Sequence, residues 1–355
     1  MKIIFASRGR IGLTDTEDTD ARYLEFDAPD QVSWHAGHAF ADGRRVLLMS
    51  VEGTRTWDGN VRSHLWTYDV ESGELAEIAT KDRPVPYMPA AVLLPDEERI
   101  IANPVVDGEQ RLLLMNLDGS DQQWLTHAGE GFTYGVHLSP DGEKLAFHAS
   151  TTQGYQLFTM NLDGTDRATV AAEPGHLFFG PDWSPDGEWL VFCDCVPETD
   201  PGHDRADLCV ARADGSSFHR VTTGQRHWFA TSYGDPETRG GGSNVPRWMP
   251  DGSGFIYTRM LPDSRTAWPY QPQRPDTDHF NRDYLPDEAR GGTELCLVDP
   301  HEGTTNVLTW SEPPVWDFRA TPSPDGSLVA FCRAAVGEAP GLWSVSYTHL
   351  TLPTN

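Results

Sequence analysis

The sequence predicts an all-β protein built from repeated units of about four short antiparallel strands. The clearest unit runs from Leu138 to Gly164. It opens with the turn Ser139–Gly142 (Ser-Pro-Asp-Gly), in which proline fixes φ and glycine can adopt the left-handed conformation that closes a hairpin. Two short apolar, aromatic-rich runs follow, and residues 161–164 (Asn-Leu-Asp-Gly) supply a second hairpin turn. One unit is therefore a small antiparallel meander.

The same turns recur along most of the chain, as in repeat architectures. The first turn ends at Gly43, Gly142, Gly187, Gly252 and Gly326, with a degenerate copy at Glu97, and the second ends at Gly73, Gly119, Gly164, Gly215 and Gly303. The turns that end at 97, 142 and 187 are 45 residues apart. Four short strands in a unit of this length match the blade of a β-propeller better than a β-solenoid or a β-sandwich.

These turns, and the apolar strands that follow them, resemble the repeat of the TolB-type (WD40-like) β-propellers over about residues 31–344. The resemblance implies six or seven four-stranded blades around a central axis. We therefore predict a single propeller domain over residues 1–344. Its six repeats are expected to start near residues 31, 86, 132, 176, 243 and 316.

The two ends of the chain bear on the predicted number of blades. Residues 1–30 are expected to supply closing strands, with Tyr23–Phe26 pairing with strands from the C-terminal end. Residues 345–355 (VSYTHLTLPTN) resemble a translated sequencing adapter, so we treat them as a non-native tail of a metagenomic fragment. We predict seven blades with the last one truncated, and six blades as the alternative. A truncated ring leaves unpaired strand edges, which lower stability and solubility.

The composition narrows the classes of partner and compartment. The formal net charge of −26 argues against a nucleic-acid partner, because phosphate neutralisation needs clustered Lys and Arg. No apolar run reaches membrane-spanning length. The five cysteines, with Cys193 and Cys195 alternating along one strand, favour buried free thiols over a disulfide framework or a zinc site. We expect a cytoplasmic monomer, or a periplasmic protein if the N-terminus is incomplete.

Long connections are expected to gather on one face of the ring. The two turn glycines of a repeat are 22 residues apart from Gly142 to Gly164, but 30 apart from Gly43 to Gly73. They are 51 apart from Gly252 to Gly303. The extra residues fall between the second and third strands of a blade, opposite both tight hairpins. The long stretch 224–243 between two blades falls on that same face, which is the expected binding face.

Residues 224–293 combine aromatic rings with cationic donors, a mixture typical of sites that bind saccharides, including acidic ones. The alternative is a lid that packs on itself, in which the aromatic side chains anchor long loops. The candidate ligand-binding residues here are His227, Trp228, Arg239, Trp268, Arg274 and His279.

The predicted innermost strands carry a second polar set. Five residues before the turn glycines stand His38, His137, Asp182, Arg247 and Thr321. The first four are expected to line an axial funnel as ligand-binding residues, and the alternative is that they tie neighbouring blades together by hydrogen bonds. A further set is expected nearer the mouth of the funnel: His35, His176, Asn244, Asp317 and Arg319.

The order of blades and the His-rich first inner strand are also similar to oligogalacturonate lyases, seven-bladed propellers that cleave uronate chains by β-elimination. The resemblance implies a histidine base and a divalent metal, such as manganese or calcium, held by inner-strand histidines. Where the family has histidines seven residues before the turn glycine of the fifth and sixth blades, this chain has Val245 and Arg319. The catalytic residues are therefore not assigned, and no metal ligands are assigned.

We predict a TolB-like propeller that binds a polar ligand, an acidic saccharide, at the long-loop face and the axial funnel. Two alternatives stay open. One is an oligogalacturonate-lyase-like enzyme that acts by metal-assisted β-elimination. The other is a non-catalytic propeller that binds a protein.

Overall fold

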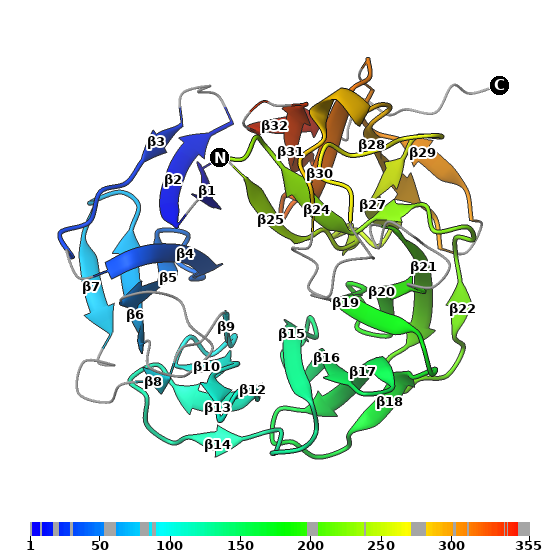
Figure 1. Cartoon of the computed structure of the whole chain (residues 1–355). Coiled ribbons are helices and arrows are strands. Elements are labelled where there is room, and N and C mark those ends of the chain that lie inside the picture. Colours follow the sequence, from blue (N-terminus) through cyan, green and yellow to red (C-terminus); the bar gives the residue numbers. More distant parts are fainter. Residues whose placement is uncertain are drawn as a thin grey trace.

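The computed structural model describes residues 2–7, 9–16, 21–28, 31–52, 62–78, 85–86, 90–196, 205–237, 239–270, 282–300, 303–310, 312–336, 338 and 340–346. These residues form radially arranged β-sheets around a central axis (Figure 1). The all-β propeller predicted from the repeated turns is therefore confirmed, and it contains one short 3-10 helix, η1 (Pro286–Glu288). The number of blades, seven or six, stays a prediction.

The strands form successive sheets along the chain. An N-terminal sheet holds β1 (Lys2–Ser7), β2 (Arg10–Asp15) and β3 (Arg22–Tyr23). The next blade holds β4 (Gln31–Ala39), β5 (Arg45–Glu52), β6 (Arg62–Asp69) and β7 (Leu75–Ile78), with β8 (Val85–Pro86) paired to β6. It is followed by β9 (Ala91–Leu93), β10 (Arg99–Ala102), β13 (Leu113–Asn116) and β14 (Gln123–Trp124), with the small hairpin β11 (Val105–Val106) and β12 (Glu109–Gln110).

Two complete meanders come next, β15 (Phe132–Leu138), β16 (Lys144–Thr151), β17 (Gly154–Asn161) and β18 (Ala168–Ala171), then β19 (Leu177–Trp183), β20 (Trp189–Cys195), β21 (Arg205–Arg212) and β22 (His219–Arg220). After β23 (His227–Trp228) and the hairpin of β24 (Ala230–Tyr233) and β25 (Gly240–Ser243) follow β26 (Arg247–Trp248), β27 (Phe255–Met260), β28 (Thr293–Val298) and β29 (Thr305–Val307). The last sheet holds β30 (Val315–Pro322), β31 (Leu328–Ala335) and β32 (Gly341–Ser346).

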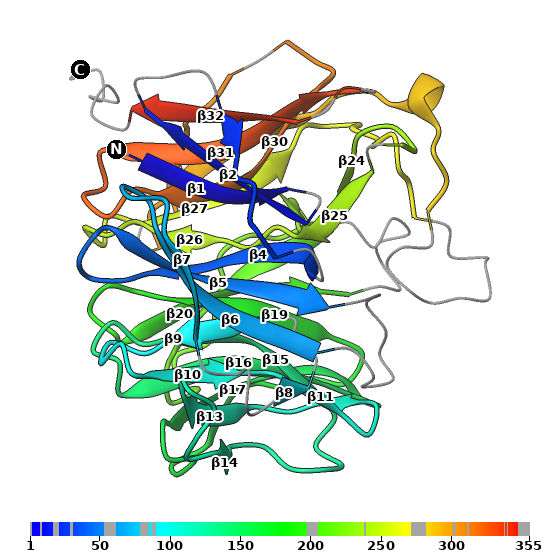
Figure 2. The ribbon, with the colours of Figure 1, turned by 90° about the vertical axis from the view of Figure 1, so that its left-hand side faces the viewer.

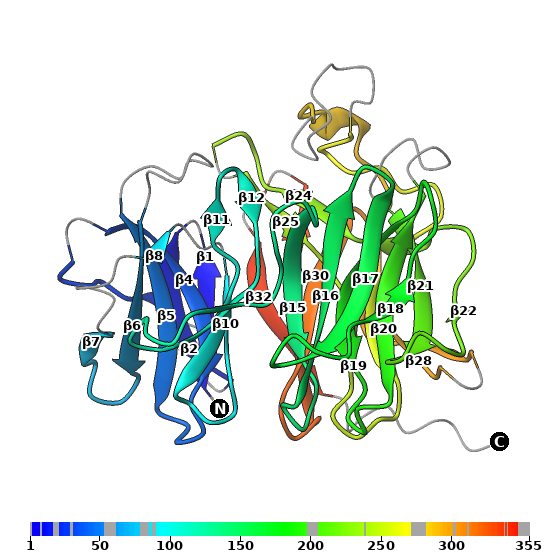
Figure 3. The ribbon, with the colours of Figure 1, turned by 90° about the horizontal axis from the view of Figure 1, so that it is seen from below.

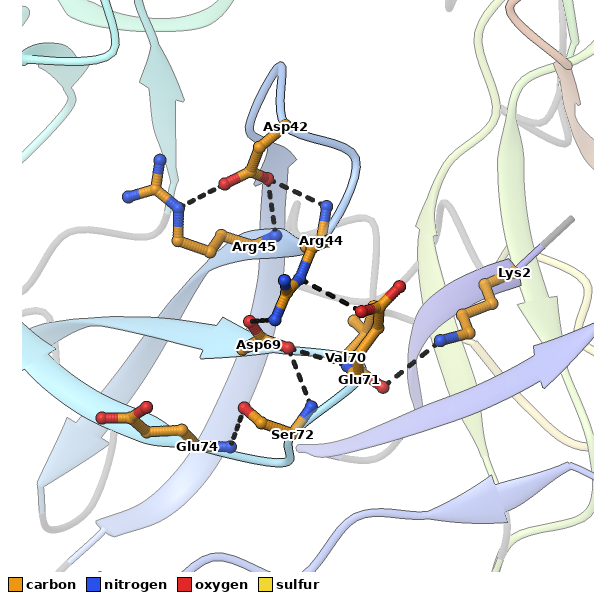
Figure 4. Close-up of polar contacts among 9 residues, drawn as sticks. All are labelled: Lys2, Asp42, Arg44, Arg45, Asp69, Val70, Glu71, Ser72 and Glu74. Carbon is orange, nitrogen blue, oxygen red and sulfur yellow. Dashed lines mark hydrogen bonds and ion pairs between the residues drawn. The ribbon is translucent and has the colours of Figure 1, made fainter.

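The hairpin turns are held by the hydrogen bonds that their sequence predicts. In the turn before β5, Asp42 Oδ1 accepts the N–H groups of Arg44 and Arg45, each at 2.9 Å, and Gly43 takes φ +67° (Figure 4). The degenerate copy keeps the geometry, because Glu97 takes φ +59° in place of a glycine. Figure 4 also shows Lys2 Nζ donating to the carbonyl of Val70, 3.4 Å away. This bond joins the N-terminal sheet to the next blade.

The core lies between neighbouring blades. Between the blades at 132–171 and 177–220, Leu157 packs with Phe178 and Phe192. Between the blades at 177–220 and 247–307, Val191, Cys193 and Phe255 are fully buried. All five cysteines are free, and four of them are buried, as expected. Burial raises the pKa of the Cys193 thiol, which therefore stays protonated.

One expectation about the N-terminal strands is wrong. Residues 23–26 do not pair with C-terminal strands, because β3 pairs with β2 and Leu24 N donates to Ile11 O at 2.8 Å. A tight turn at Gly9 (φ +70°) folds β1 onto β2 locally. Ile11 of β2 then packs on Trp34 of the next blade, so the apolar face of this sheet is buried there.

The elaborate connections and the tight turns lie on opposite faces of the ring. Figures 2 and 3 show η1 and the hairpins β11–β12 and β24–β25 on one face, which we call the loop face. The turns between β15 and β16 and between β19 and β20 lie at the other face. The described parts of 224–243 and 259–293 therefore share one rim, as the loop lengths predicted.

Candidate functional site

Four inner-strand side chains from four blades meet near the axis, and we call them the axial cluster: His38, His137, Asp182 and Arg247. Arg247 Nη1 donates to Asp182 Oδ1 at 3.1 Å and to His137 Nδ1 at 3.2 Å. The backbone N–H of Trp248 donates to Asp182 Oδ2 at 2.7 Å. The sequence spacing of five residues before each turn glycine thus identified side chains that the fold brings together.

Irregular strand pairing aims these side chains. The pairing register shifts between Tyr134 and His137 in β15, and between Phe179 and Asp182 in β19. Each bulge contains a glycine with positive φ, Gly135 at +65° in β15 and the equivalent position of β19 at +62°. A bulge of this kind re-aims the residues beside it.

The axial cluster lies toward the tight-turn face rather than the loop face. His137 is the second-last residue of β15, and the turn to β16 starts at Ser139. At the opposite end of β15, on the loop side, Phe132 keeps 37% of its surface exposed. A ligand that enters from the loop face must therefore pass along the inner strands to reach the cluster.

The electrostatics of the cluster favour one cation, one anion and two neutral imidazoles. Burial lowers the pKa of His137 and outweighs the contact with Asp182, which raises it. Burial raises the pKa of Asp182, but contacts with His137, Arg247 and the Trp248 N–H prevail, so its pKa lies below the ordinary value. The pKa of His38 is lowered first by desolvation and then by the charges of His137 and Arg247, although the residue still reaches solvent.

The cluster does not fit a divalent metal. Arg247 places its guanidinium against both His137 and Asp182, so a metal ion there would face a like charge. Among the described residues, no group of three or more His, Cys, Asp or Glu side chains is arranged to hold a metal ion.

Asn244 and His227 tie strands together. Asn244 is 1% exposed; its Nδ2 donates to Trp228 O at 2.6 Å, and its Oδ1 accepts the N–H of Arg319 at 2.9 Å. His227 is fully buried between the carbonyls of Asn244 (2.8 Å) and Thr258 (3.2 Å). Burial lowers the pKa of His227 to about 4, so the ring is neutral.

Asp317 and His176 make side-chain contacts with residues outside the axial cluster. Asp317 is fully buried and accepts two hydrogen bonds from Arg333, at 2.6 and 2.8 Å. His176 Nδ1 lies 2.7 Å from Asp194 Oδ1, and Arg220 Nε donates to the other oxygen of Asp194 at 2.9 Å. Each set of contacts joins parts of a single blade, β30 to β31 for Asp317 and the blade at 177–220 for His176.

Arg319 occupies an unusual backbone position. It takes φ +55° at the place where β15 and β19 have glycines, seven residues before the turn glycine. Its guanidinium lies against Gly242 and 5.8 Å from the ring centroid of Tyr233. A non-glycine residue in this conformation is strained, and such strain clusters at functional positions. His35, in β4, lies 3.4 Å from the Ser33 hydroxyl through Nε2.

The described aromatic side chains of the long connections pack on the protein itself. Trp228 is 1% exposed and packs on Trp316 and Phe318. Trp268 is 5% exposed, and its Nε1 donates to Gly234 O at 2.7 Å. Arg239 stacks on Trp268 with its Cζ 4.4 Å from the ring centroid. The candidates Arg274 and His279 lie outside the described residues.

Sequence reasoning missed three arginines that line one cleft: Arg205, Arg226 and Arg259. Arg205 and Arg226 come from the repeat that starts near residue 176 and Arg259 comes from the next one, and only the pairing of β23 with both β21 and β27 brings them together. A partial signal was available, because each stands where a strand meets one of the long connections.

The fold and the axial cluster define a β-propeller with a polar, part-exposed site on its inner strands. Solved structures similar to this chain include puromycin hydrolase, with a TM-score of 0.60 and 19% identity over 98% of this chain and 50% of the hydrolase. The β-propeller domain of the Trilobed protease from Pyrococcus furiosus is similar with a TM-score of 0.56 and 9% identity, over 97% of this chain and 91% of that domain.

The putative TolB from Agrobacterium tumefaciens is similar with a TM-score of 0.52 and 18% identity, over 97% of this chain and 99% of TolB. The chain thus has the TolB-type β-propeller fold that its repeats predicted. An oligogalacturonate lyase in complex with manganese is also similar, at a TM-score of 0.46 and 15% identity, and this likeness carries no argument about activity. No protein-family model and no curated protein matches the chain. No helix among the described residues is long and apolar enough to cross a membrane.

Proposed function

We propose that this propeller binds an acidic saccharide whose carboxylate pairs with Arg247 in the axial cluster. The observation that supports this proposal is the set of hydrogen bonds that the Arg247 guanidinium makes. Only Nη1 is used to reach Asp182 and His137, and no described residue accepts a hydrogen bond from Nε or Nη2. The side chain is 31% exposed, so solvent reaches it and a fork of N–H donors is available to a ligand. Such a fork matches a carboxylate.

The rest of the cluster suits sugar hydroxyls. A neutral imidazole offers one donor and one acceptor, which is what a hydroxyl group needs. The lowered pKa values of His38 and His137 keep both rings neutral at neutral pH. The exposed ring of Phe132, at the loop end of the same inner strand, can stack on a sugar face.

Isothermal titration calorimetry with trigalacturonate, and with maltotriose as the uncharged control, tests this proposal. We expect trigalacturonate to bind and Arg247→Gln to weaken binding about tenfold or more. Because that change leaves Asp182 without its cation, the double variant Arg247→Gln/Asp182→Asn, whose thermal midpoint is checked first, gives the decisive comparison. Arg212→Gln, at a surface pair with Glu188, is the matched control. Equal binding of trigalacturonate to the wild type and the folded double variant would refute the proposal.

A second candidate function, β-elimination on uronate chains, is favoured by one observation: the inner strands carry a neutral imidazole, His38, within electrostatic range of the cation of Arg247, whose charge helps to lower the pKa of His38. In this reaction the imidazole removes the proton next to the carboxylate and the cation stabilises the developing negative charge. A double bond then forms as the C–O bond of the leaving sugar breaks, and the leaving oxygen takes a proton.

Ultraviolet absorbance of the unsaturated product during incubation with oligogalacturonates, with and without manganese or calcium, tests for the lyase. Activity without added metal that is lost in His38→Ala supports this candidate. Saccharide binding with flat absorbance leaves binding alone as the function.

A further inference from the structure

A second cleft, which shares no lining residue with the axial cluster, gathers arginines in a strongly acidic chain. It has a volume of about 390 Å³ and lies on the seam between the blades at 177–220 and 247–307. The chain has 27 Lys and Arg against 53 Asp and Glu, yet three arginines line this one cleft. They are Arg205, Arg226 and Arg259.

Paired strands fix the backbone of all three arginines. The strand β23 lies between β21 and β27, pairing Trp228 with Arg205 and His227 with Arg259. Arg226 directly precedes β23, and its carbonyl accepts the N–H of Met260 at 3.0 Å. The three guanidinium groups therefore start from one small, continuous patch of sheet rather than from separate loops.

Among the charged side chains that line the cleft, Arg226 is available to bind an anion. Two carboxylates line it, and Arg259 neutralises Glu294 through Nε at 2.8 Å and Nη2 at 2.5 Å, both to the same oxygen. Although burial lowers the pKa of Arg259, Glu294 and its other neighbours raise it above the ordinary value, so Arg259 stays charged. The other acid is Asp263. Arg226 is exposed, and its guanidinium donates no hydrogen bond to a described residue.

We propose that this cleft binds the oxyanion group of a small organic ligand, a phosphate or a carboxylate, with Arg226 as the principal donor and Arg259 beside it. Guanidinium groups pair with both anions through parallel hydrogen bonds. Met260, Leu261 and Pro262 form an apolar wall of the cleft, which suits the carbon skeleton of such a ligand. The site is separate from the axial cluster and does not depend on the function proposed for it.

Calorimetric titration at low ionic strength with two probes, inorganic phosphate and trigalacturonate, tests the site. The variants are Arg226→Gln for the cleft, Arg247→Gln/Asp182→Asn for the axial cluster and Arg212→Gln as the surface control. We expect Arg226→Gln to weaken about tenfold either phosphate binding or a second trigalacturonate binding event, distinct from the one that the axial variant weakens. Arg212→Gln is expected to leave every binding event unchanged. Loss of phosphate binding alone identifies a phosphate site, and loss of trigalacturonate binding alone identifies a carboxylate site.

Arg226 is exposed, so its variant is expected to fold, and an unchanged thermal midpoint verifies this. The proposal is overturned if neither probe binds, or if Arg226→Gln and Arg226→Gln/Arg259→Gln bind both probes as tightly as the wild type does. If only the axial variant loses probe binding, the proposal for the cleft is contradicted and the proposal for the axial cluster is supported. The two proposals can therefore fail independently.

Discussion

At the scale of single residues, polar side chains on the inner strands divide into two kinds. Asp317 and Asn244 are fully enclosed and make all their bonds to neighbouring strands. The members of the axial cluster keep part of their surface exposed, with side-chain fractions of 31% for Arg247, 24% for His137 and 19% for Asp182. Sequence spacing alone cannot separate these kinds, because both place a polar residue on an inner strand.

The buried pair of Asp317 and Arg333 is expected to be a large single contribution to stability. Arg333→Ala leaves a fully buried carboxylate without its cation, which costs about 3–5 kcal/mol. The control is Arg44→Ala at an exposed pair with Asp69, where solvent screening makes the expected loss much smaller. Urea unfolding followed by tryptophan fluorescence compares the two. Similar losses would show that Asp317 is solvated.

Two buried histidines predict a pH dependence of stability. Burial lowers the pKa of His227 to about 4 and that of His148 to about 3. Below their ordinary value of about 6.5 the unfolded chain takes up protons that the folded chain does not, so stability falls as the pH drops from 6.5 toward 4. The Nδ1 of His148 has no hydrogen-bond partner among the described residues, so His148→Phe should fold and show a shallower fall of the thermal midpoint in this window. If His148→Phe leaves the slope of the thermal midpoint against pH unchanged, His148 does not contribute to this loss of stability.

At the scale of elements, the turns could be read from the sequence and the bulges could not. Ser-Pro-Asp-Gly carries its own hydrogen-bond acceptors and its left-handed residue, so it specifies a hairpin without tertiary help. The bulge at Gly135 depends on a neighbour across the strand pair, and β23 depends on two blades that meet only in the folded ring. The self-packing of Trp268 was likewise one of two open interpretations until the fold placed Gly234 beside it.

The bulge in β15 is expected to be intolerant of any side chain. A Cβ on Gly135 would lie 2.4 Å from His148 Cε1, while one on Gly43 meets nothing within 4 Å, and the two residues have nearly the same φ. Gly43→Ala therefore measures the backbone cost alone, about 1–2 kcal/mol. Gly135→Ala should cost more and also weaken trigalacturonate binding by moving His137. Equal costs for the two variants in urea unfolding would contradict this account of the bulge.

At the scale of the whole molecule, the N-terminal sheet and the last blade each have an outermost described strand that pairs on one side only. The strand β1 pairs only with β2, and β32 pairs only with β31 among the described strands. A cavity of about 220 Å³ separates the N-terminal sheet from the last blade, with Ile3 and Ile4 on one side and Leu328 on the other. Unpaired edges of this kind were expected from the strand count.

The edge at β32 is expected to promote association of chains at high concentration. Its residues Leu342 and Trp343 are 37% and 50% exposed, and the strand carries no charged side chain. Such an edge is a template for pairing with another strand, and a lysine there opposes it. Sedimentation velocity should show self-association that Trp343→Lys reduces. A wild-type chain that stays monomeric across the whole concentration range would contradict this expectation.

The central claim is that four inner strands converge on a carboxylate-binding cluster. A crystal structure of the chain with trigalacturonate tests it most directly. The account predicts a sugar carboxylate within about 3.2 Å of the Arg247 guanidinium, with hydroxyl groups on His38 or His137. Trigalacturonate bound elsewhere, with Arg247 still facing an empty channel, would contradict it.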